Sequence, residues 1–512
     1  MKKFIYSILF LLSGVLVSCD MDKMPSGTLI DTDAIQSMAD AAKVRNYFYL
    51  RLRGMNAGSP IYNMELPTDM FHAAIAYGNR GGDYYRWEWT SEDSFAESLW
   101  SYCYRSIANA NFFLQEVAKF NTEELTESEL ETLEVYKGEA YFLKAFSMFV
   151  LADRYCEVYD ASKADSQLGV MIVDSYSPSS DPATYPGRSS LKETYTNIET
   201  NLSNAATALA SVNGSVGSIY VTKDAVTALQ ARVALHKGDY DAAITAATSL
   251  LTGGTYPLIS ADNEADLLAK FKKMWINDSG DECIMQLWAD LDSESLPSSN
   301  SYNYTGLNSA GIYAPDFIPE TWVLNLFNDS DVRSSWFEAV KVTYGTIEGN
   351  VIIFNKFAGN PDLLESTAKA PTYINKIKPF RIAEQYLIAA EAYALKGGAA
   401  NEAAARTYLN ELKSKRDLDY LVNDQISGDA LLKAIKDERV RELMGEGFRM
   451  PDLKRWKQGF TRSSVQNTEL ITALASDLTI EGTNPRFLLP IPQTEIDSNP
   501  QIKGQQNPAY TK

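Results

Sequence analysis

Two segments of the sequence combine aromatic side chains with charged and amide side chains, as a ligand-binding surface does. The first runs from Arg80 to Trp89 and the second from Trp288 to Tyr313. Tyr and Trp have a flat apolar face and a polar tip, which suits both a protein core and a ligand platform. The candidates in the first segment are Asp83, Tyr84, Tyr85, Arg86, Trp87 and Trp89. Those in the second are Trp288, Asn300, Tyr302, Asn303, Tyr304, Asn308 and Tyr313.

The spacing of these residues indicates where they would point. In an extended backbone, Tyr85, Trp87 and Trp89 project to one face. That face either binds a ligand or packs into the core, and the sequence favours neither. Tyr302 and Tyr304 alternate with Asn and Ser, which favours exposure to solvent. A further candidate, Trp322, is expected to begin a helix, where packing into the core is the commoner role.

The sequence carries no recognisable catalytic or metal-binding motif. His72 and His236 are its only histidines. His72 lies near Asp69 and could contact a ligand, whereas His236 lies in a helical pattern and is expected to belong to the scaffold. No nucleophile elbow, zinc-protease motif, phosphate-binding loop or paired-cysteine motif occurs. We therefore expect no catalytic residue, no metal and no cofactor.

The first 19 residues predict export. Lys2 and Lys3 precede a short apolar run, as in a secretory signal peptide. The run ends at Leu-Val-Ser-Cys19, which resembles the lipobox of bacterial lipoproteins; the alternative is an ordinary signal peptide with a chance cysteine. We predict a signal peptide over 1–18, a lipid on Cys19 that anchors the chain to a membrane, and a flexible tether over 19–33. The other cysteines are expected to be buried small hydrophobes, with one disulfide left open: Cys103, Cys156 and Cys283.

Composition narrows the function classes. The net charge of −19 opposes binding to the phosphate backbone of nucleic acids. Hydrophobic residues make up 45% of the 512 residues, enough for a large core. After Cys19 no apolar stretch approaches the roughly 20 residues that a membrane-spanning helix needs. We therefore expect the mature chain to be soluble apart from its lipid.

Apolar residues at three- and four-residue spacing predict helices along most of the chain. The predicted helices are 34–53, 91–120, 127–155, 189–210, 222–237, 240–251, 379–396, 401–415 and 428–444. Short strands are predicted over 281–288, 337–344 and 350–357, the last two as a hairpin. We expect one domain over 34–512, with ligand-binding insertions at about 54–90 and 288–320.

Three segments share a pattern of helix, turn and Ala-rich second helix. Residues 229–244 and 387–410 show it clearly, and 139–146 more loosely. The pattern is similar to tetratricopeptide repeats, in which small residues let two antiparallel helices approach and Gly ends the first. Their irregular spacing predicts a helical-pair scaffold interrupted by long loops, and each pair needs neighbours to bury its apolar face.

Motifs along the mature chain resemble those of one family. Ile435–Trp456 contains Glu-Arg-Val-Arg-Glu-Leu and Asp-Leu-Lys-Arg-Trp, which is similar to a segment of the SusD/RagB outer-membrane lipoproteins. Residues 487–510 resemble the closing signature of this family, except that Ala509 stands where the family has Gly. Trp100–Asn111 and Glu139–Tyr159 resemble two of its helices.

This resemblance implies a mainly α, SusD-like fold and a role at the cell exterior. Family members in Bacteroidetes act as lids over a SusC-like TonB-dependent transporter in the outer membrane and capture oligosaccharides, while the RagB branch handles peptides. A sugar ring offers CH groups on one face and hydroxyls at its edge, so aromatic platforms beside Asn, Asp or Arg would bind it. We expect a glycan-binding lipoprotein, with peptide or glycopeptide capture as the alternative.

Two other classes fit less well. A glycosidase needs two carboxylates whose environments separate their pKa values, and plentiful acids do not show such a pair. A scaffold that binds only protein overlaps with docking onto a transporter. The family motif itself predicts ion pairs rather than catalysis, because Glu438 with Arg441, or Glu442 with Arg439, can pair at three-residue spacing. We expect these pairs to fix the C-terminal turn onto the scaffold.

Overall fold

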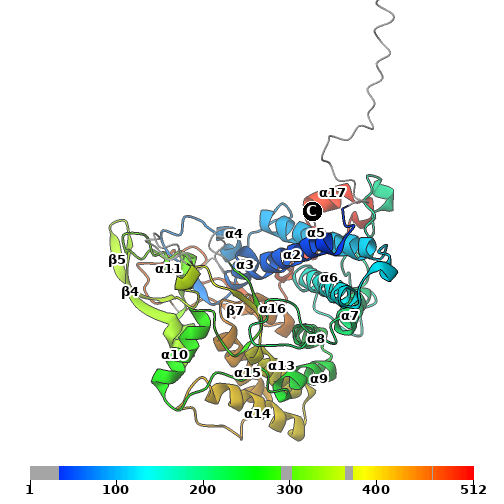
Figure 1. Ribbon diagram of the computed structural model, residues 1–512. Coiled ribbons are helices and arrows are strands. Elements are labelled where there is room, and N and C mark those ends of the chain that lie inside the picture. Colours follow the sequence, from blue (N-terminus) through cyan, green and yellow to red (C-terminus); the bar gives the residue numbers. More distant parts are fainter. Residues whose placement is uncertain (1–33, 290–301, 364–372, 464, 512) are drawn as a thin grey trace, which may run out of the picture.

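Long helices form most of the structure, together with short two-stranded sheets (Figure 1). The computed structural model describes residues 34–289, 302–363, 373–463 and 465–511. The chain has the mainly α architecture that its sequence predicts. The long helices of the first half are α2 (Met38–Asn56), α5 (Ser94–Val117), α6 (Glu127–Tyr155), α7 (Leu191–Ala208), α8 (Lys223–Lys237) and α9 (Tyr240–Thr252). Those of the second half are α13 (Ile382–Lys396), α14 (Ala399–Ser414) and α15 (Gly428–Leu443).

Each of these helices was predicted, with its ends within a few residues. The bounds of α6 match because its start carries a strong local signal. The Thr126 side chain accepts a hydrogen bond from the Glu129 backbone N–H, and the Glu129 side chain accepts one from the Thr126 N–H. This capping box satisfies two backbone donors that the first turn of a helix leaves unpaired.

The predicted helical pairs are α8–α9 and α13–α14. Gly238 ends α8 in the left-handed conformation, with φ of 77°, which Gly adopts without steric cost. Small side chains then let α8, α9 and α13 pack closely. The alanines in this cluster are Ala231, Ala234, Ala243, Ala247, Ala389 and Ala392.

Shorter elements fill the connections. The remaining helices are α3 (Ser59–Glu65), α4 (Gly82–Arg86), α10 (Glu264–Trp275), α11 (Tyr302–Thr305), α12 (Thr321–Leu324), α16 (Arg449–Trp456) and α17 (Gln493–Ser498). Antiparallel strand pairs are β1 (Phe71–Ala73) with β3 (Phe317–Pro319), β2 (Cys283–Leu287) with β6 (Ile377–Arg381), β4 (Phe337–Tyr344) with β5 (Ile347–Phe354), and β7 (Phe460–Thr461) with β8 (Thr479–Ile480). The hairpin β4–β5 is confirmed, and Gly345 supplies the positive φ of its two-residue turn.

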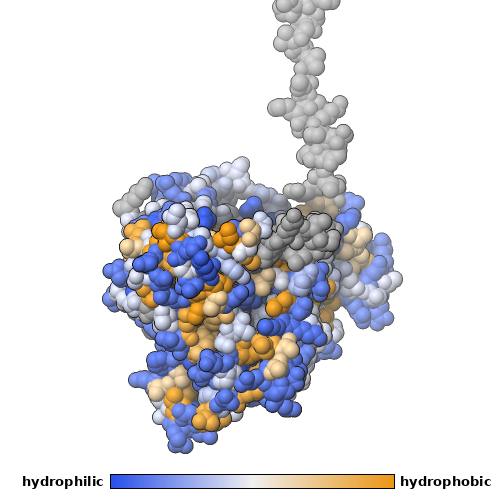
Figure 2. All heavy atoms as spheres, turned by 90° about the vertical axis from the view of Figure 1, so that its left-hand side faces the viewer, coloured by the Kyte–Doolittle hydropathy of each residue, from blue (hydrophilic) through white to orange (hydrophobic). Residues whose placement is uncertain are grey.

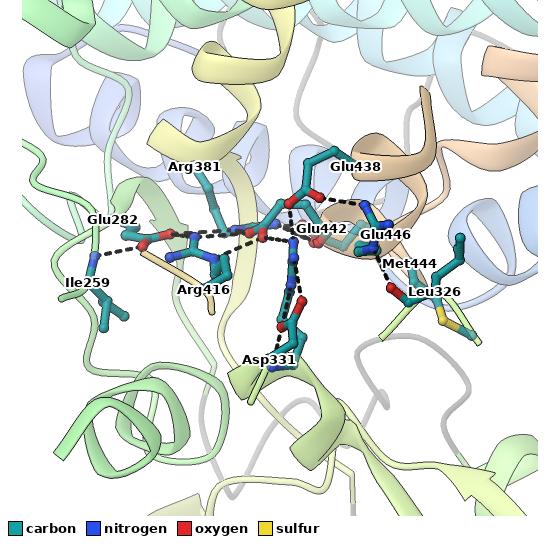
Figure 3. A network of polar contacts seen from close by, with 12 residues as sticks. Ile259, Glu282, Leu326, Asp331, Arg381, Arg416, Glu438, Glu442, Met444 and Glu446 are labelled. Carbon is teal, nitrogen blue, oxygen red and sulfur yellow. Dashed lines mark hydrogen bonds and ion pairs between the residues drawn. The ribbon is translucent and has the colours of Figure 1, made fainter. Parts of the chain in front are cut away.

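A buried network of charges joins five distant segments (Figure 3). Glu442 of α15 lies at its centre and accepts hydrogen bonds from Arg333, Arg381 and Arg416 at 3.1, 2.7 and 3.0 Å. These arginines come from the 3-10 helix η4 (Val332–Trp336), from β6 and from the loop after α14. Arg416 also donates to Glu282 at 2.7 Å. Burial alone would raise the pKa of Glu442, but the three guanidinium groups hold it well below its ordinary value.

The sequence predicted only the local part of this network. Arg441 pairs with Glu438 at 2.7 Å, as expected from their spacing. The other expected pair, Glu442 with Arg439, does not form, so this prediction is wrong. Arg439 instead donates to Asp452 at 2.9 Å. Glu442 accepts its hydrogen bonds from the arginines of other elements.

We predict that Glu442→Gln lowers the free energy of unfolding by about 3–5 kcal/mol, because it leaves buried guanidinium groups without their shared carboxylate. Urea unfolding followed by circular dichroism measures the change. Glu348→Gln is the matched control: Glu348 pairs with Lys341 on the exposed hairpin, and exposed pairs contribute little. Equal effects of the two substitutions would contradict a central role for the network.

Candidate functional site

Three segments far apart in the sequence meet beside the β4–β5 hairpin. The β1–β3 pairing aligns His72 with Ile318 and places the loop after β1 against the loop before β3. The Ala74 N–H donates to the Asp316 carbonyl oxygen at 2.8 Å. Residue 75 then pairs with a third segment, because its N–H donates to the Leu470 carbonyl oxygen at 2.9 Å. We call the surface formed by residues 74–86, 302–316 and 467–476 the loop face.

A layer of aromatic rings supports the loop face from beneath. The Tyr304 ring stacks on Phe71 with ring centroids 4.6 Å apart. Edge and tilted contacts link these rings to the others in the layer. Its members are Tyr62, Phe71, Tyr77, Tyr85, Tyr304, Phe317 and Phe354. Aromatic pairs in such geometries stabilise one another beyond the area they bury, so the loops rest on a packed base.

Polar side chains hold the upper surface together. Arg80 forms a two-pronged ion pair with Asp316, although 236 positions separate them in the chain. Arg86 donates to Asp83 at 2.7 Å and to Asn79 at 2.5 Å. The Arg80 and Asp83 side chains remain exposed to solvent. The loop face therefore offers charged groups whose positions are already fixed.

Exposed apolar side chains lie among these polar groups. Tyr302 is 45% exposed. The carbonyl oxygen of the next residue, Asn303, accepts a hydrogen bond from the N–H of Asp316, the partner of Arg80, at 2.8 Å. Ile312 and Leu474 are also exposed. Viewed from the side that carries the hairpin, the molecule shows apolar patches interspersed with hydrophilic residues (Figure 2). A flat ring beside fixed charges suits a ligand with both apolar and polar surface.

Several predicted site residues are instead in the core, which corrects the expectation for the first segment. The predicted extended backbone is wrong: residues 82–86 form α4, and Trp87 follows in the left-handed conformation with φ of 61°. Trp87 is 5% exposed, and its Nε1–H donates to the Pro67 carbonyl oxygen at 2.6 Å. The buried predicted residues of this segment are Tyr84, Tyr85, Trp87 and Trp89.

The second segment is divided between core and surface. Tyr304 is only 1% exposed, so the expectation that it faces solvent with Tyr302 is wrong. Asn303 is buried as well. Asn308 is exposed, but its side-chain oxygen accepts the N–H groups of residues 310 and 312 and so shapes its own loop. Tyr313 is half-buried and donates to Glu338 at 3.3 Å.

The remaining candidates lie elsewhere. His72 of β1 is buried, and burial, with a smaller effect of Arg462, lowers its pKa to about 4, so the ring is neutral at pH 7. Trp322 lies in α12, as predicted, and donates to the Asp69 carbonyl oxygen at 2.7 Å. Trp288, which is 48% exposed, follows β2.

Two predicted residues lie outside the described residues, Asn300 and the lipidation site Cys19. His236 belongs to the helical scaffold, as expected, with its Nδ1 3.2 Å from Asp153. Sequence reasoning missed the Arg80–Asp316 pair, for which no local signal exists.

A buried carboxyl group connects the end of α3 to the C-terminal turn. Glu65 ends α3 and accepts hydrogen bonds from the backbone N–H groups of Gly447 and Phe448, at 2.7 and 3.1 Å. Burial raises the pKa of Glu65 to about 7, although these N–H groups offset part of the effect. Within the described ranges no cluster of three or more His, Cys, Asp or Glu side chains is arranged to hold a metal. No helix among the same residues meets the length and hydropathy needed to cross a membrane.

Comparisons with known proteins give a consistent result. A sequence model of the SusD family matches residues 355–510, and one described as starch-binding and associating with the outer membrane matches 27–235. A SusD-like protein of Formosa agariphila is 24% identical over 557 residues, with both chains fully covered.

Solved structures agree with these matches. A SusD superfamily protein of Bacteroides thetaiotaomicron is 27% identical with a TM-score of 0.75, covering 92% of this chain and 100% of that one. A SusD-like carbohydrate binding protein of Bacteroides vulgatus has 19% identity and a TM-score of 0.72, over 93% of this chain and 100% of its own.

We predict that Trp87→Ala lowers the free energy of unfolding by about 3–5 kcal/mol, because it removes a large buried ring and leaves a cavity. Chemical denaturation gives the value. Trp288→Ala, which truncates an exposed ring of the same kind, should change stability little. A similar loss in both variants would show that Trp87 is not the core residue described above.

Glu65 should make stability fall as pH rises. Its folded pKa of about 7 exceeds the ordinary value of 4.5, so between these values the folded state binds more protons than the unfolded state. The free energy of unfolding should therefore drop by about 2–3 kcal/mol from pH 5 to pH 8 relative to Glu65→Gln, which cannot ionise. Denaturation of both proteins at the two pH values tests this, and parallel pH profiles would contradict it.

Proposed function

The chain belongs to the SusD family, and from that premise we propose that it binds carbohydrate at the loop face without transforming it. The observation that carries this proposal is that the loop face presents the exposed Tyr302 ring together with the exposed side chains of Arg80 and Asp83. The family description names starch binding and association with the outer membrane, and one structural relative is described as carbohydrate binding. A TM-score of 0.75 over nearly the whole chain supports a shared scaffold.

The loop face has the chemistry that a sugar requires. The Tyr302 ring can pack against the CH face of a pyranose, while Arg80 and Asp83 can hydrogen-bond to hydroxyls at its edge. Selectivity would come mainly from the polar groups, because leaving one unpaired in the complex costs about 1–3 kcal/mol. Among the described residues of the loop face no nucleophile–base pair is found, and we propose capture rather than catalysis.

The proposal extends to the cellular setting. A lipid on Cys19 would hold the protein at the outer face of the outer membrane, joined by the tether over 19–33. There it would act as the lid of a SusC-like TonB-dependent transporter and deliver captured oligosaccharide. The support is the lipobox-like sequence and family membership. Peptide or glycopeptide capture, as in the RagB branch, remains the alternative that the test below separates.

We predict that the protein binds members of a panel of soluble glycans that includes starch, and that Tyr302→Ala weakens this binding about five- to tenfold. The loss follows from removing an aromatic contact that contributes about 1 kcal/mol. Affinity gel electrophoresis and calorimetry provide the measurement. Tyr220→Ala is the matched control, since Tyr220 is 41% exposed but packs beside Tyr49 of α2.

Each other outcome has a distinct meaning. Binding to a peptide panel but to no glycan would replace the proposal with peptide capture. Release of shortened glycans would replace it with an enzyme. Glycan binding that Tyr302→Ala leaves unchanged would move the site away from the loop face.

A further inference from the structure

A cavity of about 100 Å³ lies in the scaffold, apart from the loop face. Its walls come from α2, α3, α6, α8, α10 and β6 and from the turn at residues 445–448. Two lining residues, Val150 and Lys376, are half-buried, so the cavity reaches solvent. Apolar cavities of this order hold a single aromatic ring.

Aromatic side chains form much of the wall. They come from α6 and α10, from the segment after β5 and from the turn after α15. The rings are Phe146, Phe149, Trp275, Phe357 and Phe448. Met55, Ile61 and Ile377 add aliphatic surface. Such a wall favours a flat apolar body over a strongly hydrated one.

The charges in the wall are compensated at every position but one. Arg154 pairs with Asp153, Arg232 with Glu384 at 2.7 Å, and Lys378 with Asp278 at 2.7 Å. The two carboxylates in the wall belong to Asp153 and Glu446, and both are paired. Asp153 pairs with Arg154, and Glu446 with Lys356 and Arg381. Lys376 forms no ion pair with any residue the structure describes. Among the described residues of the wall, Lys376 is therefore the positive charge that has no ion-pair partner, and it can pair with an anionic ligand.

A second donor in the wall is also unsatisfied. The Trp275 side chain is buried, and its Nε1–H finds no acceptor among the described residues. Trp275 and Lys376 are neighbours in space, because the Asn375 amide donates to the Trp275 carbonyl oxygen at 3.1 Å. A buried N–H without a partner costs free energy comparable to a lost hydrogen bond. A carboxylate has two oxygens and can therefore accept hydrogen bonds from two separate donors.

We propose that this cavity is a second ligand site, independent of the loop face, for a small organic anion with a flat apolar body, such as an aromatic carboxylate. The ring lies among the phenylalanines, and the carboxylate accepts hydrogen bonds from Lys376 and from Trp275 Nε1. A neutral ligand of the same shape packs against the aromatic wall but leaves the Lys376 charge unpaired. A small carboxylate without a ring pairs with Lys376 but leaves the aromatic wall without a packing partner.

Calorimetry of the purified protein with phenylacetate, phenylacetamide and acetate tests the proposal. Phenylacetate should bind about tenfold more tightly than either of the others. Lys376→Met should reduce its affinity about tenfold and abolish the preference over phenylacetamide, because it removes a charge-assisted contact. Lys272→Met, which alters an exposed lysine of the same region on α10, should leave the affinity unchanged.

A second variant keeps the test decisive if Lys376→Met fails to fold. Val150→Trp places a large ring in the mouth of the cavity and should abolish phenylacetate binding while the unfolding temperature stays close to that of the unmodified protein. Failure of phenylacetate to bind at millimolar concentration, or equal binding to Val150→Trp, would overturn the proposal. Tyr302→Ala should leave phenylacetate binding intact, so this result stands apart from the outcome at the loop face.

Discussion

Glu442 imposes the constraint on which the rest of the structure depends. A carboxylate removed from water needs compensating charge, and three arginines from separate elements converge on it. Each arginine also pairs with at least one further carboxylate, so no member of the network can move without leaving another buried charge unpaired. The network thus fixes β2, η4, β6, the end of α14 and α15 relative to one another.

The same corner is linked to the segment before β1 through hydrogen bonds to two acidic side chains, Asp69 and Glu65. Three residues after Glu446 comes Arg449, which binds Asp69 with two hydrogen bonds of 2.9 and 2.7 Å. Gly447 and Phe448 donate to Glu65, and the chain runs from Glu65 through Asp69 into β1. β1 in turn pairs with β3, which follows the segment that carries Tyr302. The ion pairs around Glu446 and Arg449 therefore help to position this part of the loop face.

Much of the scaffold could be predicted because its signals are local. Helix periodicity, the Thr126 capping box and glycine at the end of α8 all act within one or two turns. The network around Glu442 could not be predicted, since its partners lie 26 to 109 residues away. The error at Tyr304 has a geometric cause. In a strand, residues two apart share a face, but Tyr302 and Tyr304 lie in the helix α11, where they point about 200° apart.

The aromatic segment around Trp87 shows another limit of sequence patterns. The aromatic and charged residues of the sequence indicated two of the three segments that form the loop face, but neither the third, 467–476, nor which side chains are exposed. The left-handed backbone at Trp87 turns the chain between α4 and Trp89, and nothing in the neighbouring residue types signals it. The rings expected to contact ligand instead support the residues that face solvent.

The β1–β3 ladder consists of only three residue pairs. This short ladder affects how the sequence of such a protein can evolve. It joins the bases of two segments, 74–86 and 302–316, in which buried rings lie close in sequence to exposed side chains such as Arg80 and Tyr302. Substitutions at the exposed positions can therefore accumulate with little loss of stability, and ligand preference can diversify while the buried rings keep the framework. A ladder this short lets the loop face vary in sequence while the helical scaffold stays the same.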